Sequence, residues 1–167
     1  IADIGTGSGA IAIALAKHLP QCRVIATDKC KAALSLARQN TDTYNVTDAI
    51  EFRHGDLLDP LQGQRVRYLA SNPPYISDDE WQDVPTNVKQ YEPEQALRGG
   101  ADGLRYLRSL IGHARRHLEQ PGQLVVEIAA AQRISVTELV EQTDGLSNPH
   151  VLADHEGLPR VLVADAE

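Results

Sequence analysis

The chain has few sulfur-containing side chains and no long apolar run, and these absences narrow the kinds of protein to consider. None of its 167 residues is methionine, and only Cys22 and Cys30 are cysteines. Their separation by seven residues is not the spacing of a zinc site, and two thiols are too few for a disulfide framework. No apolar run approaches the roughly 20 residues of a membrane span, and no signal peptide is visible. We therefore expect a cytoplasmic protein with no membrane partner and no metal site.

Positive charge is also scarce. The chain has 16 Lys and Arg residues against 23 Asp and Glu residues, which gives a net charge of −7. Proteins that bind nucleic acid hold its phosphates largely with Lys and Arg. The local cluster Arg105, Arg108, Arg115 and Arg116 falls on an expected helix, where a solvated face is a better interpretation than a phosphate track. We expect nucleic acid to be at most an indirect partner.

The absence of methionine also bears on the extent of the chain. The sequence opens on Ile1-Ala2-Asp3, which reads as the end of a strand. We therefore expect a fragment whose first strand is clipped and whose N-terminal region is missing. At this length a single domain, residues 1–167, buries about 70% of its unfolded surface. We expect this domain to be a monomer.

Strand-like and helix-like segments alternate along the chain, which predicts an α/β fold with a mostly parallel sheet. The expected strands are 1–4, 23–27, 50–54, 67–71, 123–128, 150–153 and 160–164, and the expected helices are 10–18, 29–41, 104–119 and 130–143. We expect Pro121-Gly122 to stop the third helix. Residues 73–103 read as one long connection, and such connections are usually functional. The last two strands are too close together for a parallel crossover, so the last strand should be antiparallel, with helices on both faces of the seven-stranded sheet.

A glycine-rich loop, Asp3-Ile-Gly-Thr-Gly-Ser-Gly9, joins the first strand to the first helix. Glycines allow a ligand to approach the backbone closely, and a helix N-terminus adds free N–H groups. Asp28 ends the second strand, where an acidic residue typically binds ribose hydroxyls. These features fit S-adenosylmethionine, but Gly5, Gly7 and Ala10 also fit an NAD fingerprint. A plain tight turn with an exposed Asp28 is a third interpretation.

Two later strand ends favour S-adenosylmethionine. Gly55-Asp56-Leu57 follows the third strand, where the carboxylate suits an adenine amine and Leu57 suits its ring. Asn72-Pro73-Pro74-Tyr75 follows the fourth strand. The prolines make a stiff turn, because each fixes its own φ and neither donates a hydrogen bond. An exposed amide, free carbonyls and an aromatic ring form a receptor for a planar amino group, which an NAD domain does not need.

The combination resembles the class I S-adenosylmethionine-dependent methyltransferases, and within them the HemK/PrmC family of release-factor glutamine methyltransferases. The resemblance runs through essentially the whole chain and depends on residues 3–10, 71–76, 91–97, 99–104, 127–128 and 132, and on Asp154, Gly157 and Arg160. The Asn-Pro-Pro-Tyr element alone is shared with DNA adenine and RNA guanine methyltransferases, whereas the stretch 91–104 is far more specific. Ala129 and Tyr68 depart from the family pattern, and the family's small helical docking domain is absent.

The resemblance implies a Rossmann-like fold, S-adenosylmethionine as the cofactor and a peptide-chain release factor as the protein substrate. The methyl acceptor would be the side-chain amide nitrogen of the glutamine in its Gly-Gly-Gln motif. The residues expected to bind the cofactor are Asp3, Gly5, Thr6, Gly7, Ser8, Gly9, Asp28, Asp56, Leu57 and Asn72. Those expected to hold the substrate are Asn72, Pro73, Pro74 and Tyr75, of which Asn72, Pro73 and Tyr75 are the expected catalytic residues.

Two alternatives remain open at this point. One is an amino-group methyltransferase that acts on adenine or guanine in DNA or RNA, and the other is a cofactor-binding fragment without turnover. No strong general base is evident. Glu92 and Glu127 fit either supporting roles near the site or surface roles, and Trp81 either packs the long connection or contacts substrate.

Overall fold

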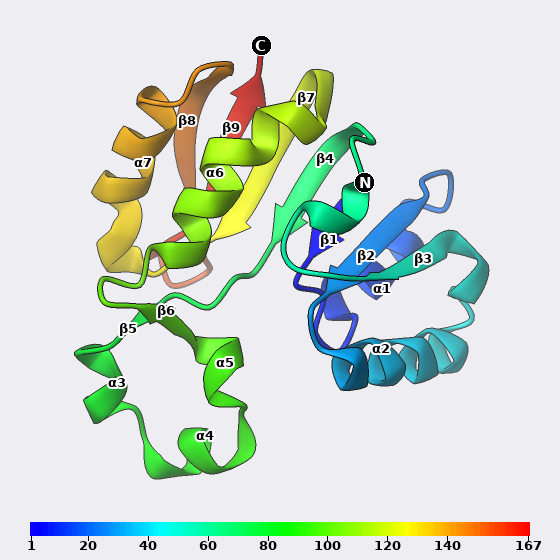
Figure 1. The fold of residues 1–167 in the computed structure, drawn as a ribbon, viewed down its shortest axis with the longest axis horizontal. Helices are drawn as coiled ribbons and strands as arrows, with labels where there is room; N and C mark the ends of the chain where they lie inside the picture. The colour runs from blue at the N-terminus through cyan, green and yellow to red at the C-terminus, as the bar shows by residue number, and fades with distance from the viewer.

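The computed structural model describes all 167 residues, and a twisted seven-stranded sheet forms its centre (Figure 1). The sheet has the order β3-β2-β1-β4-β7-β9-β8. Its strands are β1 (Ala2–Ile4), β2 (Val24–Asp28), β3 (Ile50–His54), β4 (Val66–Ser71), β7 (Leu118–Glu127), β8 (Leu146–Ala153) and β9 (Pro159–Ala166). The pairs from β3 through β7 are parallel, whereas β9 is antiparallel to both β7 and β8. This arrangement confirms the seven-stranded sheet with an antiparallel last strand.

Helices lie on both faces of the sheet, as expected. They are α1 (Ala10–His18), α2 (Lys31–Tyr44), α6 (Arg105–His117) and α7 (Arg133–Glu141), with 3₁₀ turns at Thr47–Ala49, Asp59–Leu61 and Ala130–Gln132. α1 and α2 pack together over β2 and β3, and α6 and α7 pack over the other half of the sheet. On α6 the buried residues Leu107, Leu110, Ile111 and Ala114 follow helical spacing, and three of its four arginines are exposed.

The hydrophobic core consists of two clusters on opposite faces of the sheet. Val24 and Ala26 of β2 pack against α1, whereas Ile25 between them belongs to the larger cluster that includes α6 and α7. Alternate side chains of a strand point to opposite faces, so this alternation separates the two layers. The sheet edge that carries the strand ends is therefore held rigidly from both sides.

The connection expected over residues 73–103 is more structured than the sequence suggested. It contains β5 (Ile76–Ser77), α3 (Glu80–Asp83), α4 (Thr86–Tyr91), α5 (Glu94–Leu97) and β6 (Arg98–Gly100), and β5 pairs with β6 in a two-stranded sheet. Figure 1 shows this segment projecting from one end of the main sheet. We refer to residues 76–102 as the insertion.

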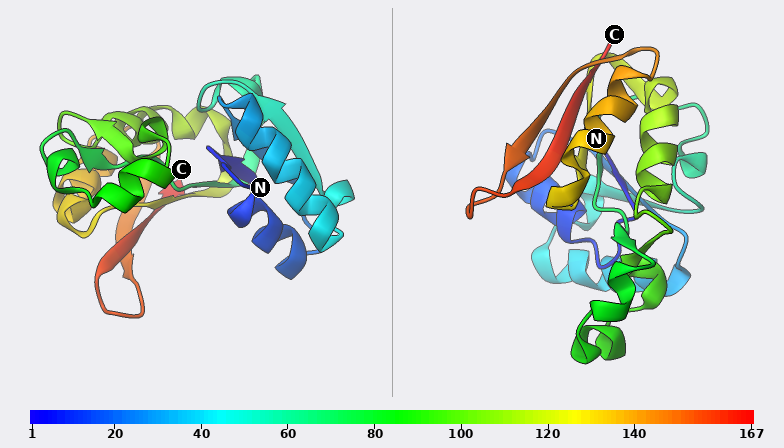
Figure 2. Two further views of the ribbon diagram at one scale, coloured as in Figure 1. Left: turned by 90° about the horizontal axis from the view of Figure 1, so that it is seen from below. Right: turned by 90° about the vertical axis from the view of Figure 1, so that its left-hand side faces the viewer.

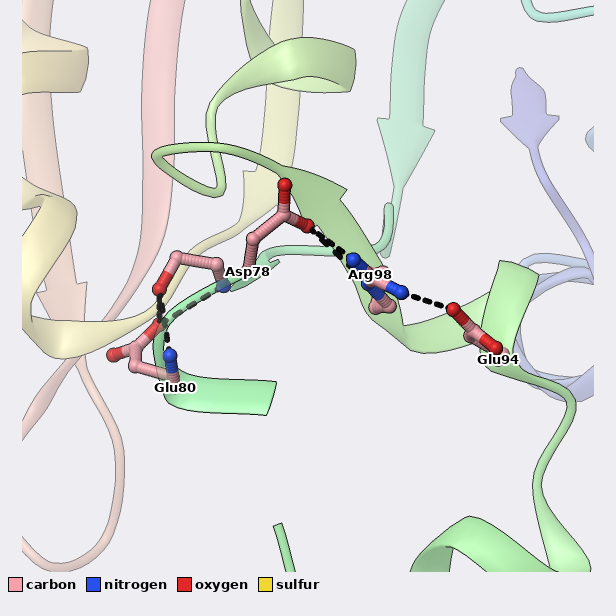
Figure 3. A network of polar contacts seen from close by, with 5 residues as sticks. Asp78, Glu80, Glu94 and Arg98 are labelled. Atoms are coloured by element: carbon pink, nitrogen blue, oxygen red, sulfur yellow. Dashed lines mark hydrogen bonds and ion pairs between the residues drawn. The ribbon is translucent and has the colours of Figure 1, made fainter. Parts of the chain in front are cut away.

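Polar contacts stabilise the base of the insertion (Figure 3). Arg98 forms ion pairs with Asp78 and with Glu94, and the Glu80 carboxylate accepts hydrogen bonds from the Ser77 backbone N–H and hydroxyl at 3.0 and 2.7 Å. The charged groups of Lys89 and Arg98 lie 5.4 and 5.6 Å from the centre of the Trp81 ring. Trp81 thus packs within the insertion.

The boundary between α6 and β7 differs from the expectation. The helix ends at His117, and β7 begins at Leu118 and continues past Pro121-Gly122, so these residues do not terminate the helix. Val66 pairs with Leu118, but Tyr68 pairs with Gln123, so four residues of β7 bulge opposite Arg67 alone. A bulge accommodates a proline that cannot donate to the ladder.

The helix expected over 130–143 is a 3₁₀ turn followed by the shorter α7.

The closing strands form a hairpin that extends beyond the body of the sheet (Figure 2). Its turn contains Asp154-His155-Glu156, where Asp154 Oδ1 accepts the N–H groups of Glu156 and Leu158, each at 3.0 Å. None of the helices is both long enough and apolar enough to span a bilayer.

Candidate active site

The predicted site residues meet at one edge of the sheet. Ile4 of β1 pairs with Thr27 of β2 on one side and with Ser71 of β4 on the other. Adjacent strands are about 4.8 Å apart, so the residues that follow, Gly5 and Asn72, lie side by side. Connections leave β1 and β4 in opposite directions, which makes this the topological switch point where α/β sheets bind ligands.

The glycine loop leaves open space at this edge. Gly5 and Gly7 have φ values of +71° and +55°, and a Cβ added to either one would have no atom within 4 Å. Gly9 is different, because its Cβ would come within 3.1 Å of Ala37 in α2. Gly5 and Gly7 therefore leave room for a ligand, whereas Gly9 allows close helix packing.

Asp3 holds the loop from inside. Its Oδ2 atom accepts hydrogen bonds from the Thr6 hydroxyl at 2.6 Å and from the Ala12 N–H at 3.0 Å, whereas its Oδ1 atom is buried without a partner. Burial raises the pKa of the Asp3 carboxyl to about 6. A buried acceptor without a donor is costly, which suggests that Oδ1 belongs to a ligand site.

One side chain from a strand and one from a helix complete the loop. Asp28 accepts the Gly7 N–H at 2.9 Å with Oδ2 and the Cys30 N–H at 2.8 Å with Oδ1, and both oxygens retain further acceptor capacity. Asn40 of α2 donates to the exposed Ser8 carbonyl at 2.8 Å. The sequence interpretation missed Asn40, which carries no signal beyond an amide on a helix.

Asp56 and Leu57 also reach this edge. Asp56 is exposed, and the Leu57 carbonyl accepts the Thr27 hydroxyl at 3.3 Å. Leu57 is partly buried and has a φ of +44°, a left-handed conformation that is unfavourable for a branched side chain. Strained backbone of this kind clusters at functional sites.

The turn Asn72–Tyr75, which we call the receptor turn, presents unused acceptors beside the glycine loop. The Asn72 side chain is exposed and makes no hydrogen bond within the chain. The carbonyl oxygens of Asn72 and Pro73 also accept none. Pro73 is buried and Pro74 half-buried, so the turn is anchored while its acceptors stay free.

The ring of Tyr75 is held from behind. Its hydroxyl donates to Glu127 Oε1 at 3.3 Å, and burial together with the Glu127 charge raises the Tyr75 pKa. Arg160 lies close enough to both groups to influence the Tyr75 pKa, and its Nε donates to Asp154 at 3.2 Å. Of the two candidate supporting glutamates, Glu127 therefore contacts the receptor turn, whereas Glu92 is exposed in the insertion.

Gln132 is a second support that sequence reasoning did not identify as such. The residue is 9% exposed, and its side chain donates to the carbonyls of Tyr75 and Gly103, each at 3.1 Å. The residue was noted only as part of the family resemblance. Its partners are 57 and 29 positions away in the sequence.

Comparisons with known proteins agree with this geometry. Residues 1–90 match the family model described as methyltransferase small domain. The release factor glutamine methyltransferases of Moorella thermoacetica and Rhodopirellula baltica are 40% and 37% identical to the chain over 98% and 97% of its length. The chain spans only 58% and 55% of these curated relatives. These matches confirm the resemblance found in the sequence.

Solved structures share the fold at lower identity. A ribosomal protein L11 methylase from Lactobacillus delbrueckii superposes with a TM-score of 0.70 at 20% identity, over 99% of this chain and 68% of that one. TrmN from Thermus thermophilus superposes with a TM-score of 0.68 at 20% identity, over 99% of this chain and 43% of that one. The fold of the chain is thus that of a known architecture.

Proposed function

Because the chain belongs to the methyltransferase small domain family, we propose that it transfers a methyl group from S-adenosylmethionine to a glutamine side-chain amide of a peptide-chain release factor. The acceptor is the glutamine of the Gly-Gly-Gln motif. The observation that carries the proposal is the receptor turn, whose unused acceptors lie beside the glycine loop at the switch point of the sheet.

The family and the fold imply S-adenosylmethionine as the methyl donor, and the site has the chemistry to hold it. Gly5 and Gly7 leave space for its methionine part, and the unpartnered Asp3 Oδ1 suits its ammonium group. Asp28 suits the ribose hydroxyls, and Asp56 with Leu57 suits the adenine. Thr6, Ser8 and Gly9 shape the loop around it.

The substrate assignment is supported by two features. The relatives that bear the name release factor glutamine methyltransferase match over nearly all of this chain, including the insertion. The net charge of −7 does not suit a nucleic acid substrate. A glutamine amide and a base amine present the same planar NH₂ group, so the receptor turn fits both. The similarity to these relatives and the negative charge favour the glutamine amide.

The chemical problem is the acceptor nitrogen, whose lone pair is delocalised into its carbonyl. The Asn72 side-chain oxygen and the Pro73 carbonyl accept the two amide hydrogens and point the nitrogen at the methyl group. Tyr75 stacks on the amide plane and excludes water. The cofactor supplies a methyl group already activated by its sulfonium. The part of the chain in this step would be to hold the acceptor nitrogen towards the donor methyl group through Asn72 and Pro73, and the proton that the methylated nitrogen loses would pass to solvent.

Orientation accounts for most of the rate in this scheme. Well-oriented reactants reach effective molarities of roughly 10⁵–10⁸ M, and acceptors aimed at developing positive charge add to this. The rigid prolines and the contact between Tyr75 and Glu127 keep these groups in position before substrate arrives.

The direct test is incubation with tritiated S-adenosylmethionine and a release factor. A second reaction contains the release factor with Gln→Ala in its Gly-Gly-Gln motif. We expect label on the first protein and none on the second. Equal labelling of the release factor and its Gln→Ala variant would contradict the glutamine assignment. Labelling of added RNA or DNA, with neither protein labelled, would favour the base-amine alternative. A cytoplasmic location and a monomeric state stay predictions.

A further inference from the structure

One buried amide joins three parts of the molecule that meet behind the receptor turn. The Nε2 group of Gln132 donates its two hydrogens to the carbonyls of Tyr75 and Gly103, and its Oε1 accepts the Ala129 N–H at 3.0 Å. An amide NH₂ has two hydrogens, so both are used on these carbonyls.

Tyr75 and Gly103 are the residues on either side of the insertion. The chain leaves the receptor turn at Tyr75, passes through residues 76–102, and returns to the same nitrogen atom at Gly103. The fit at this point is tight, because a Cβ on Gly103 would lie 2.3 Å from the Tyr75 carbonyl oxygen and 2.7 Å from Gln132 Nε2. No larger residue fits between the three groups.

We propose that Gln132 is a positioning residue for methyl transfer, which clamps both ends of the insertion against the receptor turn. The Tyr75 carbonyl belongs to the residue whose ring is to cover the acceptor amide. Because the same nitrogen holds Gly103, the receptor turn and the insertion cannot move independently. This inference rests on the proposed function and adds a residue to its site.

A purely local role for Gln132 makes a different prediction. Its bond to Ala129, together with the Gln132 N–H to the Ala129 carbonyl at 2.9 Å, caps the short turn before α7. A glutamate at position 132 keeps the acceptor for the Ala129 N–H but has no hydrogens to donate when ionised. Gln132→Glu therefore removes the clamp and retains the cap, whereas Gln132→Met removes both at similar volume.

The experiment compares these two variants with the unmodified protein in three measurements. They are the rate of methyl transfer to the release factor at saturating S-adenosylmethionine, the affinity for S-adenosylmethionine by calorimetry, and the rate of tryptic cleavage after Lys89 and Arg98 in the insertion. We expect both variants to lose kcat by on the order of 10–100-fold, since small misplacements near a reacting group have effects of this size. Cofactor affinity should stay within about twofold, because the glycine loop is untouched.

Cleavage of the insertion should accelerate about tenfold in both variants, as expected for a segment whose local stability falls. Gln142→Glu, the same change at an exposed position that follows α7 and makes no side-chain hydrogen bond, is the matched control and should behave as the unmodified protein. If Gln132→Glu transfers methyl groups and is cleaved at the rates of the unmodified protein, the proposed positioning role is wrong. Gln132 would then only cap the turn before α7. If the unmodified protein fails to label the release factor, the proposed function fails, whereas the cleavage comparison still decides whether Gln132 clamps the insertion.

Discussion

At the scale of single residues, the ionised carboxylate of Asp3 destabilises the folded state at neutral pH, because it is buried. Its pKa is raised from 3.8 to about 6, mainly by burial. The folded state therefore binds the proton more tightly than the unfolded state. The stability that the protonated group contributes is complete below about pH 4 and is lost as the pH rises to about 6.

Asp3→Asn should separate stability from function. The asparagine oxygen can still accept from Thr6 and Ala12, but the buried charge is gone. We expect a gain on the order of 1–3 kcal/mol in the free energy of unfolding above pH 6, and little change below pH 4. Cofactor affinity should fall, because an amide NH₂ replaces the unpartnered acceptor. Thermal unfolding from pH 4 to 8 and calorimetry measure both effects, and a less stable variant at pH 8 would contradict the account.

Tyr75 offers a second test at this scale. Its hydroxyl bond to Glu127 is long, at 3.3 Å, so its loss should reduce kcat by only about fivefold, which corresponds to roughly 1 kcal/mol. Tyr75→Phe and Glu127→Ala should have similar effects, and the double variant should lose little more than either one. Tyr44→Phe, at an exposed tyrosine of α2, is the control. If the loss of kcat in the double variant equals the product of the two single losses, Glu127 does not act through Tyr75.

The residues at the strand ends were predictable because their signals are local. Asp3 lies in the short strand β1, Asp28 ends β2 and Asn72 follows β4, and parallel strands bring their carboxyl ends together. The partners of Tyr75 were not predictable, since Glu127 lies 52 positions away and Gln132 lies 57 positions away. A hydrogen bond across such a separation leaves no pattern in the sequence around either residue.

At the scale of elements, the fit between Gly103 and the receptor turn can be tested against a matched glycine. Gly103 and Gly63 have nearly equal φ values of +74° and +77°. A Cβ at Gly63 meets nothing within 4 Å, whereas one at Gly103 meets the Tyr75 carbonyl. Gly63→Ala should therefore lower stability by about 1 kcal/mol through backbone strain alone.

Gly103→Ala adds an overlap with backbone atoms to the same strain. We expect its free energy of unfolding to fall by about 1–3 kcal/mol more than in Gly63→Ala, the usual cost of overpacking. Denaturant unfolding of the two variants measures the difference. Equal losses would mean that Gly103 is not held against Tyr75.

The elements also show which sequence signals are reliable. α1 and β3 have the predicted bounds, since a glycine loop precedes α1 and the residues of β3, Ile50-Glu-Phe-Arg-His, begin with the apolar-polar alternation of a strand. Pro121-Gly122 was misleading because a bulge lets β7 continue through a pair that usually ends an element. The helices of the insertion have four to six residues and bury none, so they have no apolar periodicity to detect.

At the scale of the whole molecule, the net charge of −7 distinguishes the main proposal from the base-amine alternative. We expect single-stranded RNA and duplex DNA to bind more weakly than about 10⁻⁴ M at physiological salt, the weak limit of ordinary non-specific binding. Fluorescence anisotropy with labelled oligonucleotides measures this affinity. Binding in the micromolar range would favour a nucleic acid substrate.

The central claim is that the receptor turn holds the acceptor amide while the glycine loop holds the cofactor. The most direct measurement is the single-turnover rate of methyl transfer to a release factor by Asn72→Ala, with S-adenosylmethionine saturating. We predict that this rate falls by about 10²–10³-fold, the loss typical for one oriented polar group, while cofactor affinity changes little. An unchanged rate, or a loss of cofactor affinity as the main effect, would contradict the claim.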